Sequence, residues 1–249
     1  MLSLRLSEEF AGALRNVAPP GPGVCPVCWT FHDPDFARCH ACPERSELDV
    51  VAPISYALDG GELACALRGY KDEPRARDRY HHGIRLAAVL ARFLGEHEGH
   101  VARAAGTDAF DVVTVVPSRT GLGKIAGTVV GHTAGRYERL LGPAGPGGRR
   151  FDRRRYVARR PLHGEPVLLI DDAWVSGSSA QSAAAALRDA GASHVACVVI
   201  GRWLAPAFGP AWGPVERLYA QLPAFDWSRC AAEAPSQAPR GVRLSTMPA

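Results

Sequence analysis

Two adjacent carboxylates and a hydroxyl-rich loop lie close together in the second half of the sequence. Asp171 and Asp172 directly follow the apolar run at residues 167–170, and a loop of small polar residues at 176–179 comes shortly after them. Paired carboxylates suit a vicinal diol, whose two hydroxyls each need an acceptor, or a divalent cation. Small residues at the start of a helix leave backbone N–H groups free for an anion. This arrangement predicts a site for ribose 5-phosphate. The alternative is an ordinary strand-to-helix turn in which Asp and Ser only cap the backbone.

The elements around this segment form a parallel βαβ unit. A strand at 167–170, a helix at 179–190 that ends at Gly191, and a strand at 195–200 follow one another. Ligands of open α/β sheets bind beyond the carboxyl ends of the strands. We therefore expect Asp171 and Asp172 to face a crevice and not the core.

Earlier segments extend the same alternation. Further strands are predicted at 54–58 and 110–116, and helices at 62–68, 80–98 and 124–141. The fold class is therefore α/β, with a parallel sheet flanked by helices over residues 50–230. Residues 1–49 hold a helix at 4–17, with Ser7 as a cap near its start, and a cysteine-rich module. Residues 231–249 are rich in Ala, Pro and Ser and are expected to form a poorly ordered tail.

Four of the seven cysteines have the spacing of a metal site. Cys25 and Cys28 form one C-x2-C pair, and Cys39 and Cys42 form a second. This spacing favours tetrahedral thiolate ligation of a structural Zn²⁺, with iron in a rubredoxin-like site as the alternative. A disulfide framework fits less well because no secretory signal precedes the module. Whether the module also contacts nucleic acid or a partner is left open.

The remaining cysteines and the histidines are expected to be ordinary structural residues. Cys65, Cys197 and Cys230 are isolated in the sequence. Cys197 lies in a predicted strand and is expected in the core. His81, His82 and the other histidines are expected at the surface more often than as ligands, although His32 and His40, near the cysteine pairs, could replace a cysteine as a ligand.

The segment at 167–179 resembles the motif that binds phosphoribosyl pyrophosphate (PRPP) in type I phosphoribosyltransferases. That motif is an apolar strand, two acidic residues, two variable residues and a Thr/Ser/Gly loop. With the following helix, the strand that ends at Gly201-Arg202-Trp203, and the cysteine module, the chain is most similar to the ComF branch of competence-related phosphoribosyltransferases. The resemblance covers residues 50 to 205 approximately and implies the twisted parallel sheet of that family.

The resemblance also implies roles for single residues. Asp171 and Asp172 are expected to be catalytic and to hold the ribose hydroxyls. At Val175 the family usually carries Thr or Ser, so one side-chain donor to the phosphate is lost. The residues implied to bind PRPP are Asp171, Asp172, Val175, Ser176, Gly177, Ser178 and Ser179.

Two further segments resemble parts of the same family. Ser118, Arg119 and Thr120 follow the strand at 110–116 and occupy the place of the pyrophosphate loop; the alternative is an exposed polar turn. A Walker P-loop is excluded here because the first glycine of its motif is missing. The segment at 67–71 resembles one that precedes the nucleotide-type core, so Lys71 is either near the site or an ordinary surface lysine.

The segment at 145–160 lies where the family has a mobile loop over PRPP. Its arginine-rich stretch at 149–160 can bind pyrophosphate, an acidic substrate or a nucleic-acid backbone, or it can be a solvated basic loop with no specific ligand. An Arg-Gly-Phe-Asn-type stretch of the family is missing, which leaves acceptor recognition open. The arginines concerned are Arg149, Arg150, Arg153, Arg154 and Arg155.

These features predict an enzyme that binds PRPP with Mg²⁺, transfers its phosphoribosyl group to a nitrogenous acceptor and releases pyrophosphate. The alternative is a non-catalytic PRPP- or nucleotide-binding accessory protein of DNA uptake and competence. The net charge of +4 is too small to indicate nucleic-acid binding by itself. Without a signal-type or membrane-spanning apolar run, a cytoplasmic protein without membrane insertion is expected. The oligomeric state is left open.

Overall fold

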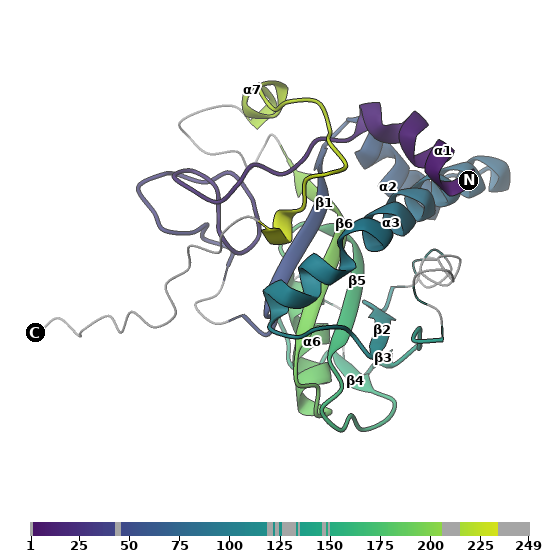
Figure 1. Cartoon of the computed structure of the whole chain (residues 1–249), viewed down its shortest axis with the longest axis vertical. Coiled ribbons are helices and arrows are strands. Elements are labelled where there is room, and N and C mark those ends of the chain that lie inside the picture. Colours follow the sequence, from purple (N-terminus) through teal and green to yellow (C-terminus); the bar gives the residue numbers. More distant parts are fainter. Residues whose placement is uncertain are drawn as a thin grey trace, which may run out of the picture.

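A four-stranded parallel sheet forms the centre of the molecule (Figure 1). The computed structural model describes residues 2–42, 46–118, 122, 125, 133, 135–145, 148, 150–205 and 215–233. The strand order is β1-β6-β5-β2, and every neighbouring pair is parallel. These strands are apolar runs without a polar face, as expected for a sheet that is covered on both sides. Their bounds are β1 (Val50–Leu58), β2 (Val112–Val115), β5 (Val167–Trp174) and β6 (Val195–Leu204).

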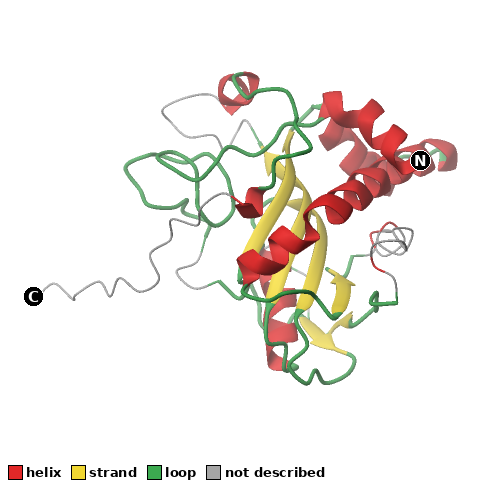
Figure 2. Cartoon of the chain, in the orientation of Figure 1, coloured by secondary structure: helices red, strands yellow, loops and turns green. Residues whose placement is uncertain are grey.

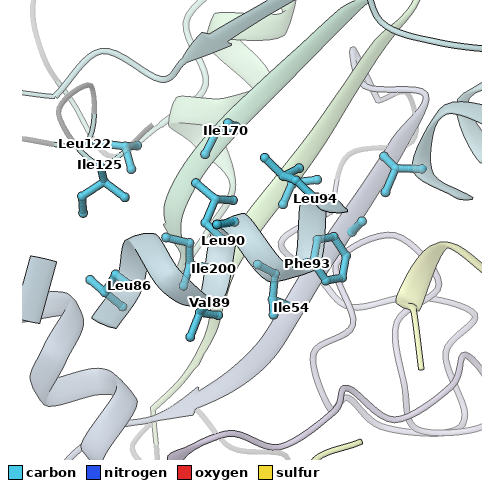
Figure 3. Packing of buried hydrophobic residues seen from close by; sticks show 14 of the residues in the cluster. Ile54, Leu86, Val89, Leu90, Phe93, Leu94, Leu122, Ile125, Ile170 and Ile200 are labelled. Carbon is cyan, nitrogen blue, oxygen red and sulfur yellow. The ribbon is translucent and has the colours of Figure 1, made fainter. Parts of the chain in front are cut away.

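Helices cover both faces of the sheet (Figure 2). One face packs against α1 (Leu2–Phe10), α2 (Glu62–Asp72) and α3 (Ala76–Ala105), and the other packs against α6 (Ser178–Asp189). The α3 face is filled by Leu86, Leu90 and Phe93, which meet Ile170 and Ile200 of the sheet (Figure 3). Because side chains alternate along a strand, the neighbours of these strand residues point to the α6 side.

Shorter elements lie around this core. The strands β3 (Leu141–Pro143) and β4 (Tyr156–Ala158) form an antiparallel pair. A 3-10 helix, η1 (Ala11–Ala13), extends α1, and the chain also forms α7 (Val215–Ala220) and a second 3-10 helix, η3 (Ala231–Glu233). Among the described residues, no helix combines the length and the apolarity needed to cross a membrane.

The predicted α/β class with a parallel sheet between helices is confirmed, but several boundaries were wrong. The strand predicted at 54–58 begins at Val50, and the strand predicted to end at Ile170 continues to Trp174. Both extensions pair with the long strand β6, and at the end of β5 this tertiary pairing overrides the polar Asp171 and Asp172.

Three local predictions were also wrong. Much of the helix predicted at 124–141 lies outside the described residues, but its end does not stay helical, because Leu141 begins β3. Ser7 does not cap a helix; it lies inside α1 and its hydroxyl donates to the Leu4 carbonyl at 2.8 Å. The tail begins later than predicted, since η3 still packs against β1 and α3.

Residues of the N-terminal segment are buried in the hydrophobic clusters on both faces of the sheet. Phe10 and Leu14 are buried with the residues of α3. Cys25, Cys28 and Cys39 are buried together with α6 and the opposite face of the sheet. Trp29 fastens the cysteine module to β1, because its indole N–H donates to the Val51 carbonyl at 3.0 Å.

Candidate functional site

The candidate site lies where β5 leaves the sheet and α6 begins. Residues 175–177 connect the two elements, and Gly177 is the N-cap of α6. Its φ of 77° is in the left-handed region, and a Cβ there would lie 2.1 Å from the Trp174 ring. Only glycine therefore fits both the conformation and the contact. The turn is held tightly against the buried Trp174 ring, which positions the first residues of the helix.

Asp172 is held by two residues of α2. The Tyr70 hydroxyl donates to Asp172 Oδ2, and the Lys71 ammonium forms an ion pair with the same oxygen. The Asp172 side chain is only 7% exposed. Burial and the Asp172 charge raise the pKa of Tyr70 well above its usual range, so the phenol remains a donor. Of the two alternatives for Lys71, the structure therefore selects the position beside Asp172.

Asp171 occupies a different environment. It is the residue before Asp172 in a regular strand, so its side chain leaves the opposite face of the sheet. Its Oδ1 accepts a hydrogen bond from the Asp172 backbone N–H at 3.0 Å. Burial, followed by repulsion from the Asp172 carboxylate, raises the pKa of Asp171 well above its usual range.

The expectation that both carboxylates face an open crevice is therefore wrong for this conformation. Counted over the whole residue, the exposed fractions are 8% for Asp171 and 5% for Asp172. The physical reason is the extension of β5, which continues pairing with β6 as far as Trp174 and so encloses both residues in the sheet.

The hydroxyl-rich loop is more accessible than the carboxylates. Val175 is 62% exposed, and Ser176 is exposed with its Oγ 3.1 Å from Ser178 Oγ. Ser179 Oγ accepts a hydrogen bond from Arg155 Nη1 at 3.0 Å. The start of α6 thus gathers hydroxyl groups, backbone N–H groups and one cation, which is the chemistry of an anion site.

The predicted pyrophosphate loop is described only at its first residue. Ser118 is exposed and follows β2, which pairs with β5 so that Val115 lies opposite Ile170. Because the two strands are parallel, Ser118 follows β2 at the same edge of the sheet at which Val175 follows β5. Arg119 and Thr120 lie outside the described residues.

The arginine-rich stretch makes several internal contacts. Arg153 forms ion pairs with Glu47 and Asp189 at 2.9 and 2.6 Å. Arg155 is 4% exposed, and its Nε has no hydrogen-bond partner in the described part of the chain. Arg150 and Arg154 are exposed, whereas Arg149 lies outside the described residues. The stretch is thus packed along α6, from Ser179 at its start to Asp189 at its end, and is also a source of exposed cations.

Cys25, Cys28, Cys39 and Cys42 form one cluster, as their spacing predicted. Their sulfur atoms all lie within 4.8 Å of one another. The Cys25–Cys42 and Cys28–Cys39 sulfur separations are 3.8 and 3.5 Å, too long for disulfide bonds. Hydrogen bonding with the other three sulfurs lowers the pKa of the Cys25 thiol well below its usual range. The cluster is suited to hold a structural metal ion.

Arg202 joins this cluster to the loop after β5. Its Nε donates to the Cys28 carbonyl at 2.6 Å, and its Nη2 lies 3.6 Å from Cys28 Sγ. Its Nη1 donates to the Trp174 carbonyl at 2.8 Å and to the Val175 carbonyl at 3.3 Å. Sequence reasoning gave Arg202 no role. The sequence does show an arginine within an apolar strand. Because a buried cation requires polar partners, this position could have been recognised as a contact site.

Comparison with known proteins gives no match, either to a protein-family model or to a curated protein.

Proposed function

We propose that the chain is a phosphoribosyltransferase-type protein of the ComF-like kind. In this proposal it binds PRPP with Mg²⁺, transfers the phosphoribosyl group to a nitrogenous acceptor and releases pyrophosphate. The observation that carries the proposal is the loop at 175–179, which sets hydroxyl groups at the start of α6 three residues after the acidic pair at the end of a parallel strand. A type I phosphoribosyltransferase sheet would account for this placement.

The loop would bind the 5-phosphate of the ribose. Ser176, Ser178 and Ser179 would donate hydrogen bonds to phosphate oxygens, and the N–H groups of the first turn of α6 would add to them. Arg155, which donates a hydrogen bond to Ser179 Oγ, would offset part of the phosphate charge. Val175 would contribute only its backbone N–H.

The carboxylates would act on the ribose after a rearrangement of the α2 contacts. Asp172 Oδ2 accepts a hydrogen bond from Tyr70 and forms an ion pair with Lys71. After these contacts rearrange, a diol hydroxyl would donate to this carboxylate. Lys71 would then face the diphosphate side as a neutralising cation. Mg²⁺, if bound together with PRPP, would supply positive charge for the leaving pyrophosphate.

We further propose zinc as the metal of the four-cysteine cluster. Four sulfurs at about 2.3 Å from one ion lie about 3.8 Å apart in a tetrahedron. The Cys25–Cys42 separation of 3.8 Å and the Cys28–Cys39 separation of 3.5 Å fit this geometry. Arg202 beside Cys28 would offset part of the negative charge that four thiolates bring.

Calorimetric titration of the full chain with PRPP and Mg²⁺ tests the proposal. Binding is expected, and Ser178→Ala combined with Ser179→Ala should weaken it about tenfold or more, because hydrogen bonds to a charged phosphate are lost. Ser193→Ala, an exposed serine at the other end of α6, serves as the matched control and should bind normally. Absence of PRPP and nucleotide binding would overturn the proposal.

A screen of purine, pyrimidine and amine acceptors then separates the enzyme from the accessory protein. An enzyme releases pyrophosphate only when an acceptor is present. PRPP binding without release by any acceptor would favour the accessory role in DNA uptake. The observation that favours the accessory role is Val175, which is apolar and exposed at the loop position where the family usually carries a hydroxyl.

A further inference from the structure

A second group of metal-binding side chains lies far along the chain from the four-cysteine cluster. His97 and His100 are one turn apart on α3, and Cys230 directly precedes η3. The ligand atoms of these three residues all lie within 4.8 Å of one another. Figure 1 shows η3, in yellow, beside α3. His97 is only 4% exposed, so the expectation of surface histidines is wrong here.

The hydrogen bond at His97 decides which ring nitrogen is free. His97 Nε2 lies 2.6 Å from the Trp227 carbonyl oxygen, which can only accept. Nε2 therefore carries the proton, and in the neutral ring Nδ1 carries the lone pair. Metal-binding histidines characteristically donate their other ring N–H to a carbonyl or carboxylate in this way.

The spacing of the two rings matches ligation of one ion. His97 Nδ1 and His100 Nδ1 are 3.3 Å apart. Two nitrogens at about 2.0–2.1 Å from a tetrahedral ion are about 3.3 Å apart. Without an ion, a proton on His100 Nδ1 can be shared with His97 Nδ1 and the Glu233 carboxylate, and a cation that replaces this proton would be bound by both rings.

Two residues of the C-terminal segment lie beside the histidines. Cys230 supplies a buried sulfur, and Glu233 Oε1 lies 3.0 Å from His100 Nδ1. Two imidazoles and a thiolate suit a borderline divalent ion such as Zn²⁺. Burial raises the pKa of the Cys230 thiol to about 11, so a metal would have to displace its proton.

The geometry points to a second metal site, in which His97, His100 and Cys230 bind a zinc-type divalent ion, with Glu233 at its edge beside His100. The ion fastens the segment at 227–233 to α3. This site does not depend on the proposed ribose-phosphate function.

Counting metal equivalents on the full chain tests the site. The protein is freed of metal under reducing conditions and titrated with Zn²⁺ against a chromophoric chelator. Two equivalents are expected, one for each cluster. His100→Gln and Cys230→Ser should each lose one equivalent and keep the other, whereas Cys39→Ser should lose the four-cysteine equivalent and keep the second. Cys65→Ser, an exposed cysteine, is the control and should bind two.

Co²⁺ identifies which equivalent is lost. The equivalent removed by His100→Gln should show the weaker sulfur-to-metal absorption of a single thiolate, and the remaining one that of four. His100 is partly exposed, so its substitution decides the matter even if Cys230→Ser does not fold. A wild-type chain that binds one equivalent, or a second equivalent that persists in His100→Gln, would overturn the site.

Discussion

Arg202 and Cys28 are joined by two contacts, a hydrogen bond of 2.6 Å from Nε to the Cys28 carbonyl and a 3.6 Å approach of Nη2 to its sulfur. The same guanidinium donates to the carbonyls of Trp174 and Val175. One side chain of β6 therefore connects the four-cysteine cluster to the loop proposed to bind phosphate. A change at either end is transmitted through a rigid planar group.

Substitution of Arg202 by Met should destabilise the fold by about 3 kcal/mol, because several buried carbonyl groups lose their donor. PRPP binding should weaken as well, since the Trp174 and Val175 carbonyls are no longer held. Urea unfolding and calorimetry measure the two effects. Arg154→Met, at an exposed arginine, is the control and should change stability by less than about 0.5 kcal/mol. Equal stabilities of the two variants would contradict the bridging role.

Removal of Lys71 should cost about 2 kcal/mol, because Asp172 then loses the cation paired with its buried carboxylate and keeps the hydrogen bond from the Tyr70 hydroxyl. The double-mutant cycle of Lys71→Met with Asp172→Asn isolates this pair. Asp172→Asn should cost less in the Lys71→Met background than in the wild-type chain. Additive losses in unfolding free energy would show that the two groups do not interact.

Asp171→Asn should stabilise the protein increasingly as the pH rises. The folded state raises the pKa of Asp171, so it favours the protonated carboxyl. The stability that this provides is fully present below the ordinary carboxyl pKa and is lost as the pH rises towards the folded pKa. Between the ordinary carboxyl pKa and the folded pKa, the unfolding free energy of the variant should rise relative to wild type by up to about 1.4 kcal/mol per pH unit. Urea unfolding at a series of pH values measures the difference, and a difference that is independent of pH would refute the assignment.

Gly177→Ala should destabilise the fold by about 3 kcal/mol and shift the fluorescence of Trp174. The added Cβ meets both a left-handed backbone and the Trp174 ring at 2.1 Å. Gly164→Ala is the matched control, because Gly164 has a φ of 94° and no atom within 4 Å of its Cβ position. The control should lose only the backbone part, about 1–2 kcal/mol. A loss no larger than that of the control would mean that the ring moves aside at no cost.

Local patterns were sufficient to predict the α/β class, the βαβ unit around 167–200 and the clustering of four cysteines. An apolar run of β-branched residues, a capped alanine-rich helix and two C-x2-C pairs each depend on neighbours within a few residues, so sequence spacing describes them directly. Cys197 was likewise placed correctly in the core, where it is fully buried.

Contacts between distant segments determined the rest. The end of β5 depends on pairing with β6, and this pairing buries Asp171 and Asp172 where the local pattern indicated an open edge. Asp172 meets Tyr70 and Lys71 across about one hundred residues of chain, as the separation of 102 for Tyr70 shows. Arg202 reaches Cys28 over a separation of 174 residues, and His97 reaches Trp227 over 130. Such partners share no local periodicity, because they are selected by the packing of helices on the sheet and by the need of buried charges and polar atoms for a partner.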